Sequence, residues 1–304
     1  MKQICKDGLY IGNREDAFTC LTEDTDITHI LTIEAEPLSG TDIKYDKGGN
    51  DILLKHVRCL DQLEADLLSY LDECIQFIVK SLRDGKVLVH CFAGVSRSAT
   101  VILAYMMYNQ NIALEQALHD LKAIYPKADP NPGFMFQLHL FEAMGKKVDK
   151  SNSLYKQYNL RNIAKQVQQT GYRELPEEIL KDSFENQKTG AKKRNYKCRK
   201  CRYKLFNGEN RLDHIPGTGE DFLSWNDKLI TEEHKKLITS RCTSYFIEPL
   251  PWMASLLVGT VEGKLCCPKC SGRIGSFNWA GEQCSCGRWV TPAFQFHKSR
   301  IDES

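Results

Sequence analysis

The segment VLVHCFAGVSRSAT, residues 87–100, sets a cysteine, a glycine and an arginine at short, fixed spacing. The thiolate of a residue such as Cys91 is a strong nucleophile. Arg97, six residues later, carries a planar guanidinium that can hold two phosphate oxygens at once. A nucleophilic sulfur and an oxyanion clamp in one loop are what the transfer of a phosphoryl group to a side chain requires.

The elements around this loop must aim both groups at one phosphate. KVLVH, residues 86–90, is typical of a buried strand, and a helix is predicted to begin near Ser96. The N-terminus of a helix has free N–H groups and positive potential, so it binds an anion and stabilises a negatively charged sulfur. Gly94 lets the backbone turn where a side chain would clash. We therefore expect phosphate to be bound by the loop residues Phe92, Ala93, Gly94, Val95, Ser96 and Arg97.

Strand-like and helix-like segments alternate on both sides of the loop. GLYIG, HILTI and LLKHVRCL precede KVLVH as short β-like runs, while residues 65–83 repeat apolar side chains at helical spacing. After the loop, VILAYMMY, LEQALHDLKAIY and FMFQLHLFEAM follow helical patterns. This alternation predicts an α/β domain over residues 1–145, with a central mixed sheet flanked by helices.

The pattern His-Cys-x-x-Gly-x-x-Arg-Ser, between that strand and that helix, resembles the cysteine-dependent protein phosphatases, specifically the small dual-specificity group. The resemblance covers roughly residues 3–145. It implies that Cys91 forms a cysteinyl-phosphate, that Arg97 holds the equatorial oxygens, and that Ser98 assists departure of the thiolate. It also implies that His90 sets the hydrogen bonds of the loop, and that catalysis needs no metal.

The leaving alkoxide or phenoxide needs a proton, and the intermediate then needs an activated water. In this family an aspartate on the loop before the helix that precedes the signature performs both tasks. Asp66 starts the helical pattern of residues 65–83 and suits an N-terminal cap. Asp61 lies 30 residues before Cys91, which matches the family's spacing, so we predict that Asp61 is the catalytic acid. The alternative for Asp61 is a solvated turn carboxylate.

Two further features concern the loop and its substrate. Asn131, in DPNPGF, falls where the family often has a polar residue that supports the active-site loop; a helix-initiating turn residue is the alternative. The loop contains no lysine, whereas lipid phosphatases of the superfamily carry extra cations there, so a phosphoinositide substrate is disfavoured. The resemblance implies a shallow pocket that admits phosphoserine and phosphothreonine as well as phosphotyrosine in phosphoprotein substrates.

Composition predicts an intracellular protein of two domains. The 304 residues suit two modest domains, and 42% hydrophobic with 26% charged residues is ordinary for a globular protein. The start, MKQICKDGLYIG, lacks the apolar core of a secretory signal, and no apolar run is long enough to span a bilayer. We therefore expect no membrane partner and no disulfide framework, so the 13 cysteines need another explanation.

Eight of these cysteines fall between residues 198 and 286. YKCRKCRYKLF and LCCPKC contain C-x2-C pairs, and QCSCG contains a C-x-C pair. Such pairs are typical of closed tetrahedral zinc sites, whose binding energy stabilises a small fold. We predict a mainly β domain over residues 196–304 with two structural zinc ions, bound by Cys198, Cys201, His214, Cys242, Cys267, Cys270, Cys284 and Cys286.

The division of these ligands between the two ions leaves alternatives open. The preferred grouping is sequential: Cys198, Cys201, His214 and Cys242 hold one ion, and Cys267, Cys270, Cys284 and Cys286 hold the other. Interleaved sites are the alternative to this grouping, and disulfides are the alternative to metal. Cys266 lacks the C-x2-C spacing to Cys270, so it is predicted to bind nothing; His297 is an alternative ligand.

Residues 146–195 are polar, and we predict a linker that is partly helical around 154–168. Residues 187–204 then carry nine lysines and arginines and no acid. Such a run suits a nuclear-import signal or an electrostatic footprint for RNA, and a solvated linker is the alternative.

TSYFIEPLPWM and GSFNWAGEQCSCGRWVTPAFQ extend the resemblance, over nearly the whole chain, to the zinc-binding branch of the dual-specificity phosphatases. That branch implies a protein of the nucleus and the cytoplasm, whose zinc domain acts on pre-60S particles or RNA in assembly of the large ribosomal subunit. In relatives this role is separable from catalysis, so an assembly factor in which catalysis is dispensable is the alternative function. A polynucleotide phosphatase acting on RNA 5′ ends is a further alternative.

Overall fold

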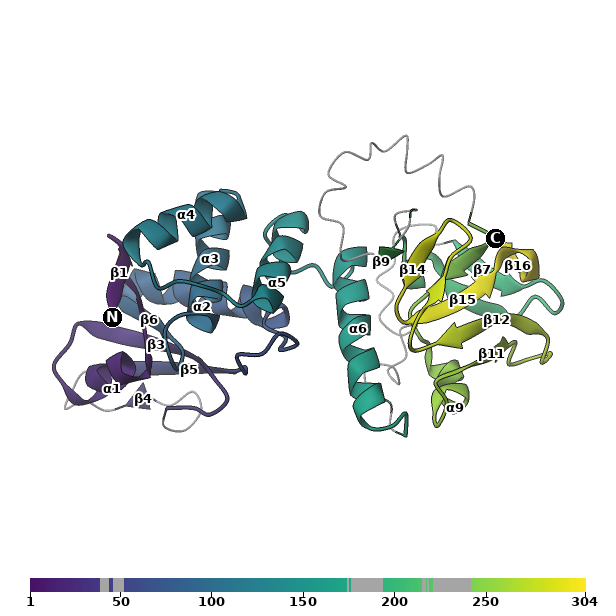
Figure 1. Ribbon diagram of the computed structural model, residues 1–304, viewed down its shortest axis with the longest axis horizontal. Coiled ribbons are helices and arrows are strands. Elements are labelled where there is room, and N and C mark those ends of the chain that lie inside the picture. The colour runs from purple at the N-terminus through teal and green to yellow at the C-terminus, as the bar shows by residue number, and fades with distance from the viewer. Residues whose placement is uncertain are drawn as a thin grey trace. The chain divides into compact units, whose positions relative to one another are not determined.

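The computed structural model describes residues 1–38, 52–173, 194–214 and 242–304, together with 44–45, 175, 217 and 219–220. The chain divides into two compact units, Met1–Lys150 and Ser151–Ser304 (Figure 1). Within the described ranges, every helix is too short or too polar to cross a bilayer.

A six-stranded mixed sheet in the order β1-β2-β6-β3-β5-β4 forms the centre of the first unit. Its strands are β1 (Lys2–Cys5), β2 (Leu9–Gly12), β3 (Ile27–Glu34), β4 (Lys44–Tyr45), β5 (Ile52–Arg58) and β6 (Lys86–His90). β6 lies inside the sheet, parallel to both β2 and β3. Val87, Leu88 and Val89 are fully buried, because a parallel strand is covered on both faces.

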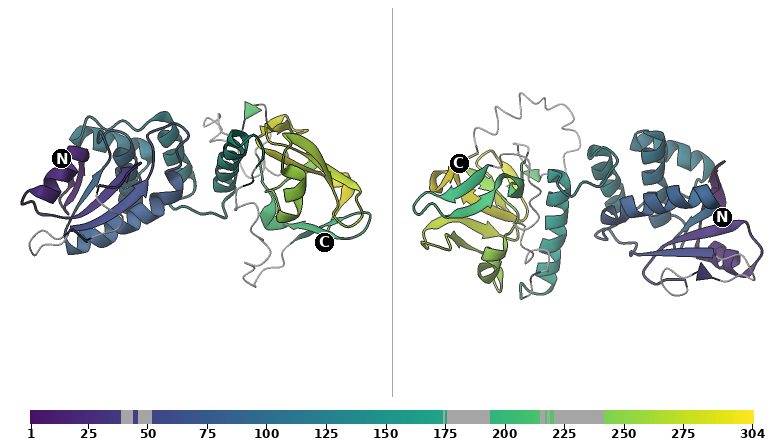
Figure 2. Two further views of the ribbon diagram at one scale, coloured as in Figure 1. Left: turned by 90° about the horizontal axis from the view of Figure 1, so that it is seen from below. Right: turned by 180° about the vertical axis from the view of Figure 1, so that it is seen from behind.

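Helices cover both faces of this sheet, as Figures 1 and 2 show. They are α1 (Arg14–Thr22), α2 (Leu71–Asp84), α3 (Arg97–Gln110), α4 (Leu114–Ile124) and α5 (Pro132–Ala143). α1 packs on the face toward which Leu88 points, while α2 and α3 also contact β6. α3 is buried from Arg97 to Met107 and packs against α2, α4 and α5. The predicted α/β domain with a central mixed sheet is confirmed.

One local prediction needs adjustment, and two elements were missed. The helix expected over residues 65–83 begins as a short 3-10 helix, Leu68–Tyr70, and is α-helical only from Leu71. The reason lies in α5, where the Gln137 side chain accepts hydrogen bonds from the backbone N–H groups of Leu67 and Leu68 at 2.8 and 2.7 Å. The strand β1 and the helix α1 were not anticipated from the sequence.

The second unit combines one long helix with small β-sheets, as predicted for a mainly β domain. Its elements are α6 (Ser153–Gln169), β7 (Asn195–Cys198), β8 (Lys204–Asn207), β9 (Gly219–Glu220), β10 (Ser244–Phe246), α9 (Ala254–Leu257), β11 (Glu262–Cys266), β12 (Arg273–Asn278), β13 (Glu282–Gln283), β14 (Arg288–Val290), β15 (Ala293–His297) and β16 (Ile301–Glu303). The sheet orders are β10-β15-β12-β11, β13-β14-β9 and β16-β7-β8.

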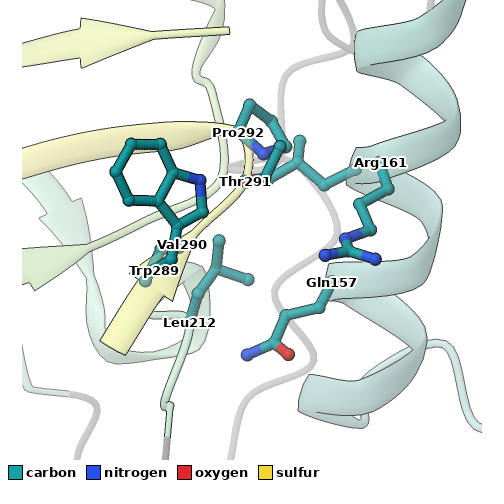
Figure 3. A pocket seen from close by; sticks show the side chains of 8 residues that line it. Gln157, Arg161, Leu212, Trp289, Val290, Thr291 and Pro292 are labelled. Atoms are coloured by element: carbon teal, nitrogen blue, oxygen red, sulfur yellow. The ribbon is translucent and has the colours of Figure 1, made fainter. Parts of the chain in front are cut away.

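Helix α6 lies inside the range 146–195 that was predicted as a linker, but it belongs to the core of the second unit. Its buried face, with Leu160, Ile163 and Val167, joins the same hydrophobic cluster as the strands of the second unit. The Gln157 amide donates to the Asp213 carbonyl at 2.6 Å. Figure 3 shows Gln157 and Arg161 of α6 facing the end of β14 and the residues Thr291 and Pro292 that follow it. The sequence pattern was helical but too polar to reveal this packing.

Candidate active site and metal centres

The predicted nucleophile lies where β6 leaves the sheet. Cys91 is fully buried, and its sulfur lies 3.3 Å from the hydroxyl oxygen of Ser98 in the first turn of α3. A hydroxyl at this distance can donate a hydrogen bond to a sulfur anion. The structure therefore brings Cys91 and Ser98 together in the arrangement that stabilisation of a departing thiolate requires.

Gly94 shapes the loop between Cys91 and α3. Its φ of +73° lies in the left-handed region, where a side chain is strained. A Cβ at this position would also lie 2.7 Å from the Gly12 carbonyl oxygen and 3.0 Å from the Tyr125 hydroxyl. Backbone hydrogen bonds hold the loop on either side of Gly94: the Arg14 N–H donates to the Phe92 carbonyl at 3.2 Å, and the Asp129 N–H donates to the Val95 carbonyl at 2.9 Å. Only glycine fits this close approach to β2.

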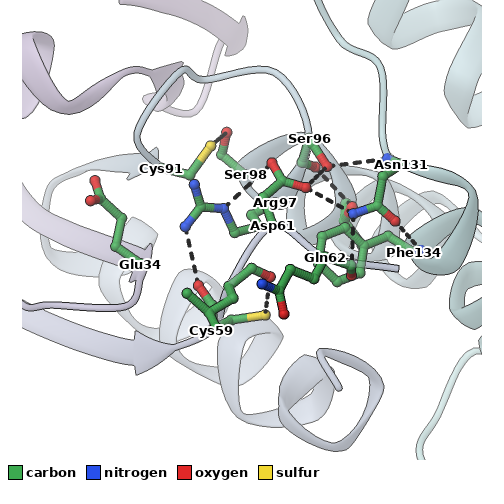
Figure 4. Close-up of polar contacts among 12 residues, drawn as sticks. Glu34, Cys59, Asp61, Gln62, Cys91, Ser96, Arg97, Ser98, Asn131 and Phe134 are labelled. Carbon is green, nitrogen blue, oxygen red and sulfur yellow. Dashed lines mark hydrogen bonds and ion pairs between the residues drawn. The ribbon is translucent and has the colours of Figure 1, made fainter. Parts of the chain in front are cut away.

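Arg97, the first residue of α3, has a side chain only 9% exposed. Its Nη1 donates to the Cys59 carbonyl at 3.1 Å, which fixes the guanidinium at the end of β5. Burial raises the pKa of the neighbouring Cys59 thiol to about 12, and the positive charge of Arg97 opposes this rise. Figure 4 shows the guanidinium among these groups on the side of the site that holds Cys91. The clamp and the nucleophile thus face the same space.

Asp61 reaches the same loop from the segment after β5. One of its carboxylate oxygens accepts hydrogen bonds from the Ser96 hydroxyl and the Asn131 amide, both at 2.8 Å, while the other lies 3.6 Å from Arg97 Nε. The Asp61 side chain stays 36% exposed, so solvent and substrate can reach it. Figure 4 shows this carboxylate above the start of α3. Asp61 is therefore held beside the phosphate loop.

The other two candidates of this region also have defined places. Asp66 accepts a hydrogen bond from the Ser69 N–H at 3.1 Å, which is the capping role expected for it. Asn131 caps α5 through the Phe134 N–H at 3.0 Å, and it also binds Asp61. Both interpretations of Asn131, a helix-initiating residue and a support of the active site, hold at once.

Behind the loop, the predicted residue His90 has buried polar partners that sequence reasoning did not find. His90 is fully buried, and its Nε2 lies 2.8 Å from the Thr32 hydroxyl. Its Nδ1 lies 3.6 Å from the Glu34 carboxylate, which in turn accepts a hydrogen bond from Arg14 at 2.8 Å. Thr32 pairs with His90 in the register between β3 and β6. No local spacing could reveal these partners, because only the sheet brings them together.

Because His90 is buried, the stability of the first unit should depend on pH. Burial lowers the pKa of the His90 imidazole from 6.5 to about 4. Protonation therefore favours the unfolded chain: the stabilisation is complete above pH 6.5 and is lost as pH falls toward 4. We expect the free energy of unfolding of the first unit to fall by about 3 kcal/mol over that window. Hydrogen exchange of β6 peptides in urea measures it. In His90→Gln, the free energy of unfolding should change less steeply with pH between 6.5 and 4. An unchanged dependence on pH would contradict the prediction.

Four of the predicted zinc ligands meet in a first cluster, Cys198, Cys201, Cys267 and Cys270, whose sulfurs all lie within 4.8 Å of one another. Each cysteine pair sits on the same kind of tight turn. The Arg202 N–H donates to the Cys198 carbonyl at 2.8 Å and the Ser271 N–H to the Cys267 carbonyl at 2.9 Å. Arg202 and Ser271 both have positive φ. This shared turn directs the two thiols of each pair to one side.

A second cluster contains the remaining four predicted ligands, whose ligand atoms also lie within 4.8 Å of one another. They are His214, Cys242, Cys284 and Cys286. His214 Nε2 lies 3.5 Å from the Cys242 sulfur and 3.3 Å from the Cys286 sulfur. All eight predicted ligands are thus brought together in two clusters. The sequential grouping is wrong, however, because each cluster combines two of the four earlier ligands (residues 198–242) with two of the four later ones (residues 267–286). Cys266 and His297 belong to neither cluster.

The residues of both clusters fit zinc. A tetrahedral ion with Zn–S bonds of about 2.3 Å separates two sulfurs by about 3.7 Å, and a sulfur from a nitrogen by slightly less. The observed Cys198–Cys270 and Cys201–Cys267 sulfur distances are 3.7 and 3.5 Å. A hydrogen bond from the Gly272 backbone lowers the pKa of the Cys270 thiol to about 7, which favours the thiolate that a metal binds. Four protein ligands in each cluster leave no open position, as in structural sites.

Comparison with known proteins agrees with this fold. The dual specificity phosphatase catalytic-domain family matches residues 9–144. Dual specificity protein phosphatase 12 of Homo sapiens is 45% identical over 302 residues, covering 97% of this chain and 86% of the human protein. The Rattus norvegicus protein of the same name is 42% identical over 299 residues, with the same two shares. Tyrosine-protein phosphatase YVH1 of Saccharomyces cerevisiae is 33% identical over 335 residues, covering 97% and 90%.

The chain therefore belongs to the dual specificity protein phosphatases, in the family of dual specificity protein phosphatase 12.

Proposed function

We propose that the first unit hydrolyses phosphotyrosine, phosphoserine and phosphothreonine in proteins through a cysteinyl-phosphate. The Cys91 thiolate attacks phosphorus, Arg97 holds the equatorial oxygens, and Asp61 protonates the oxygen that leaves. Asp61 then removes a proton from water, which attacks phosphorus as the S–P bond breaks, and Ser98 donates a hydrogen bond to the departing sulfur. No step uses a metal.

One observation carries this proposal: Asp61 is held between Ser96 and Arg97 of the phosphate loop. An acid in that position can reach an oxygen bound to the phosphorus that Cys91 attacks. The protein substrate class follows from the family and from the side chains of the loop, Phe92, Ala93 and Val95. None of these carries the extra charge that a polyphosphorylated lipid headgroup would require.

The catalytic acid is tested by a matched pair of substitutions. We expect Asp61→Asn to reduce kcat on an aryl phosphate by about 100-fold or more, because the amide cannot donate the proton. Asp66→Asn, five residues away, should leave kcat within about twofold, since asparagine still caps the 3-10 helix. In the unsubstituted protein the rate should fall at high pH, where Asp61 loses the proton that it donates. A pH–rate profile shows whether this fall disappears in Asp61→Asn. Equal losses in both variants would refute the assignment of Asp61.

For the second unit we propose two structural zinc ions and a role in assembly of the large ribosomal subunit, with the protein in both nucleus and cytoplasm. The observation that favours a pre-60S or RNA partner is the charge on the turns of the first cluster, where Arg199, Lys200 and Arg202 are exposed. Arg199 and Arg202 also contact Asp302. Lys188, Lys192 and Lys193 of the same basic run lie outside the described residues.

Full-length variants separate this role from catalysis. We propose that Cys91→Ser co-sediments with pre-60S particles as the unsubstituted protein does, whereas Cys270→Ser is lost from them. Binding through phosphate contacts should also weaken steeply between low and moderate salt. Loss of co-sedimentation in Cys91→Ser would instead link the particle to the catalytic unit. Cells rescued by Cys91→Ser would show that catalysis is dispensable for assembly.

A further inference from the structure

A cavity of about 190 Å³ lies in the first unit, among β1, the turn after it, α3 and α4. Its floor is apolar and includes Leu9 and Met106, which are 0% and 4% exposed. For scale, an engineered apolar cavity of about 150 Å³ binds benzene. The cavity can therefore accept a six-membered ring with a short substituent.

Tyr105 forms one wall of the cavity. Tyr105 is only 6% exposed, and within the described part of the chain its hydroxyl makes no hydrogen bond. Cys5 and Asp7, which line the same cavity, act electrostatically on this hydroxyl, so it faces the cavity. Burial raises the pKa of Tyr105 to about 12. The hydroxyl oxygen itself is not sealed from solvent, so a polar atom of a ligand in the cavity can form a hydrogen bond with it.

The rim of the cavity is acidic. Asp7 and Asp120 both line it, and none of its described lining residues is a lysine or an arginine. Gln116 and His119 contact the same carboxylate oxygen of Asp120, Oδ1, at 2.8 and 3.2 Å, and within the described residues its second oxygen is left for a ligand. Two carboxylates above an apolar floor favour a ligand that is both cationic and apolar.

The cavity is separate from the phosphate site. Arg97 is the first residue of α3, and Tyr105 follows eight residues later. At the rise of an α-helix this spacing is about 12 Å along the axis. None of the residues that contact the phosphate loop lines the cavity.

We propose that this cavity binds a small primary amine with an apolar body. The body lies on Leu9 and Met106, and the ammonium donates hydrogen bonds to the carboxylates of Asp7 and Asp120 and to the Tyr105 oxygen. The site goes beyond the proposed phosphatase reaction, and its ligand is defined by charge and size.

Benzylamine and benzyl alcohol, which share a ring and differ in charge, test the proposal by ligand-observed NMR titration of the full-length protein. We expect benzylamine to bind about tenfold tighter than benzyl alcohol, since only the amine forms charge-assisted hydrogen bonds. Asp7→Asn, Asp120→Asn and Tyr105→Phe should each weaken benzylamine binding severalfold. Asp24→Asn, which removes an exposed carboxylate elsewhere on the unit, is the matched control and should have no such effect.

Three outcomes would overturn the proposal. They are equal binding of the two probes, equal effects of Asp7→Asn and Asp24→Asn, and displacement of benzylamine by inorganic phosphate, which would place the amine in the phosphate site. Because the readout is binding, a failure of the phosphatase mechanism would leave these results interpretable on their own.

Discussion

Replacement of Cys91 by serine should reduce turnover of an aryl phosphate by about four orders of magnitude or more. A serine hydroxyl is a much weaker nucleophile than a thiol, because it stays protonated where a thiolate would attack. Phosphate binding should persist, because Arg97 and the glycine turn at Gly94 are untouched. Steady-state kinetics measures the first effect, and protection of the protein against thermal unfolding by inorganic phosphate measures the second.

A matched cysteine controls for the loss of a thiol. Cys266 lies in the second unit outside both metal clusters and is partly exposed, so Cys266→Ser should keep normal turnover. Trapping of a phosphorylated enzyme during turnover of the unsubstituted protein would identify the intermediate directly. Substantial turnover by Cys91→Ser would show that another group attacks phosphorus and would refute the proposed mechanism.

Removal of zinc should unfold the second unit and leave the first unit folded. Structural zinc contributes about 10–16 kcal/mol of apparent binding energy in small zinc-finger peptides, as much as the whole stability of a typical domain. All four tryptophans of the chain lie in the second unit, so tryptophan fluorescence reports its unfolding while phosphatase turnover reports the first unit. A strong chelator should shift the fluorescence to that of solvated indole without loss of turnover.

Substitutions test the ligands and their grouping. Cys270→Ser should lower the zinc content by one ion and destabilise the unit, whereas Cys266→Ser should do neither. In the interleaved clusters Cys201 and Cys270 share an ion, so Cys201→Ser with Cys270→Ser should still retain one zinc by native mass spectrometry. Sequential sites would lose both ions in that double variant, and such a loss would contradict the structure.

Local spacing was sufficient for those parts of the site that are close in sequence. A strand ending at His90, a nucleophile at Cys91 and an arginine six residues later define one loop, and the observed strand is the predicted one, Lys86–His90. The C-x2-C pairs likewise had to close on tight turns. In both cases the residues that act together are joined by too few bonds to lie far apart.

Residues that meet only through the fold were beyond local patterns. The Glu34–Arg14 pair reaches His90 because β3 and β6 are neighbours in the sheet, although many residues separate them in sequence. The late start of α2 depends on Gln137 of another helix. The division of zinc ligands failed for the same reason: spacing identifies a pair of cysteines, and tertiary contacts decide which other pair faces it.

The crossing of the two metal clusters has a consequence for synthesis on the ribosome. Neither cluster is complete until the chain has been translated at least to Cys270, because each cluster includes cysteines from the later segment. A nascent chain that stops before this point carries several unligated thiols, while the catalytic unit, encoded earlier, is already complete. We therefore expect a chain that ends before Cys270 to be an active but aggregation-prone phosphatase. The second unit should fold only after its last cysteines have been synthesised.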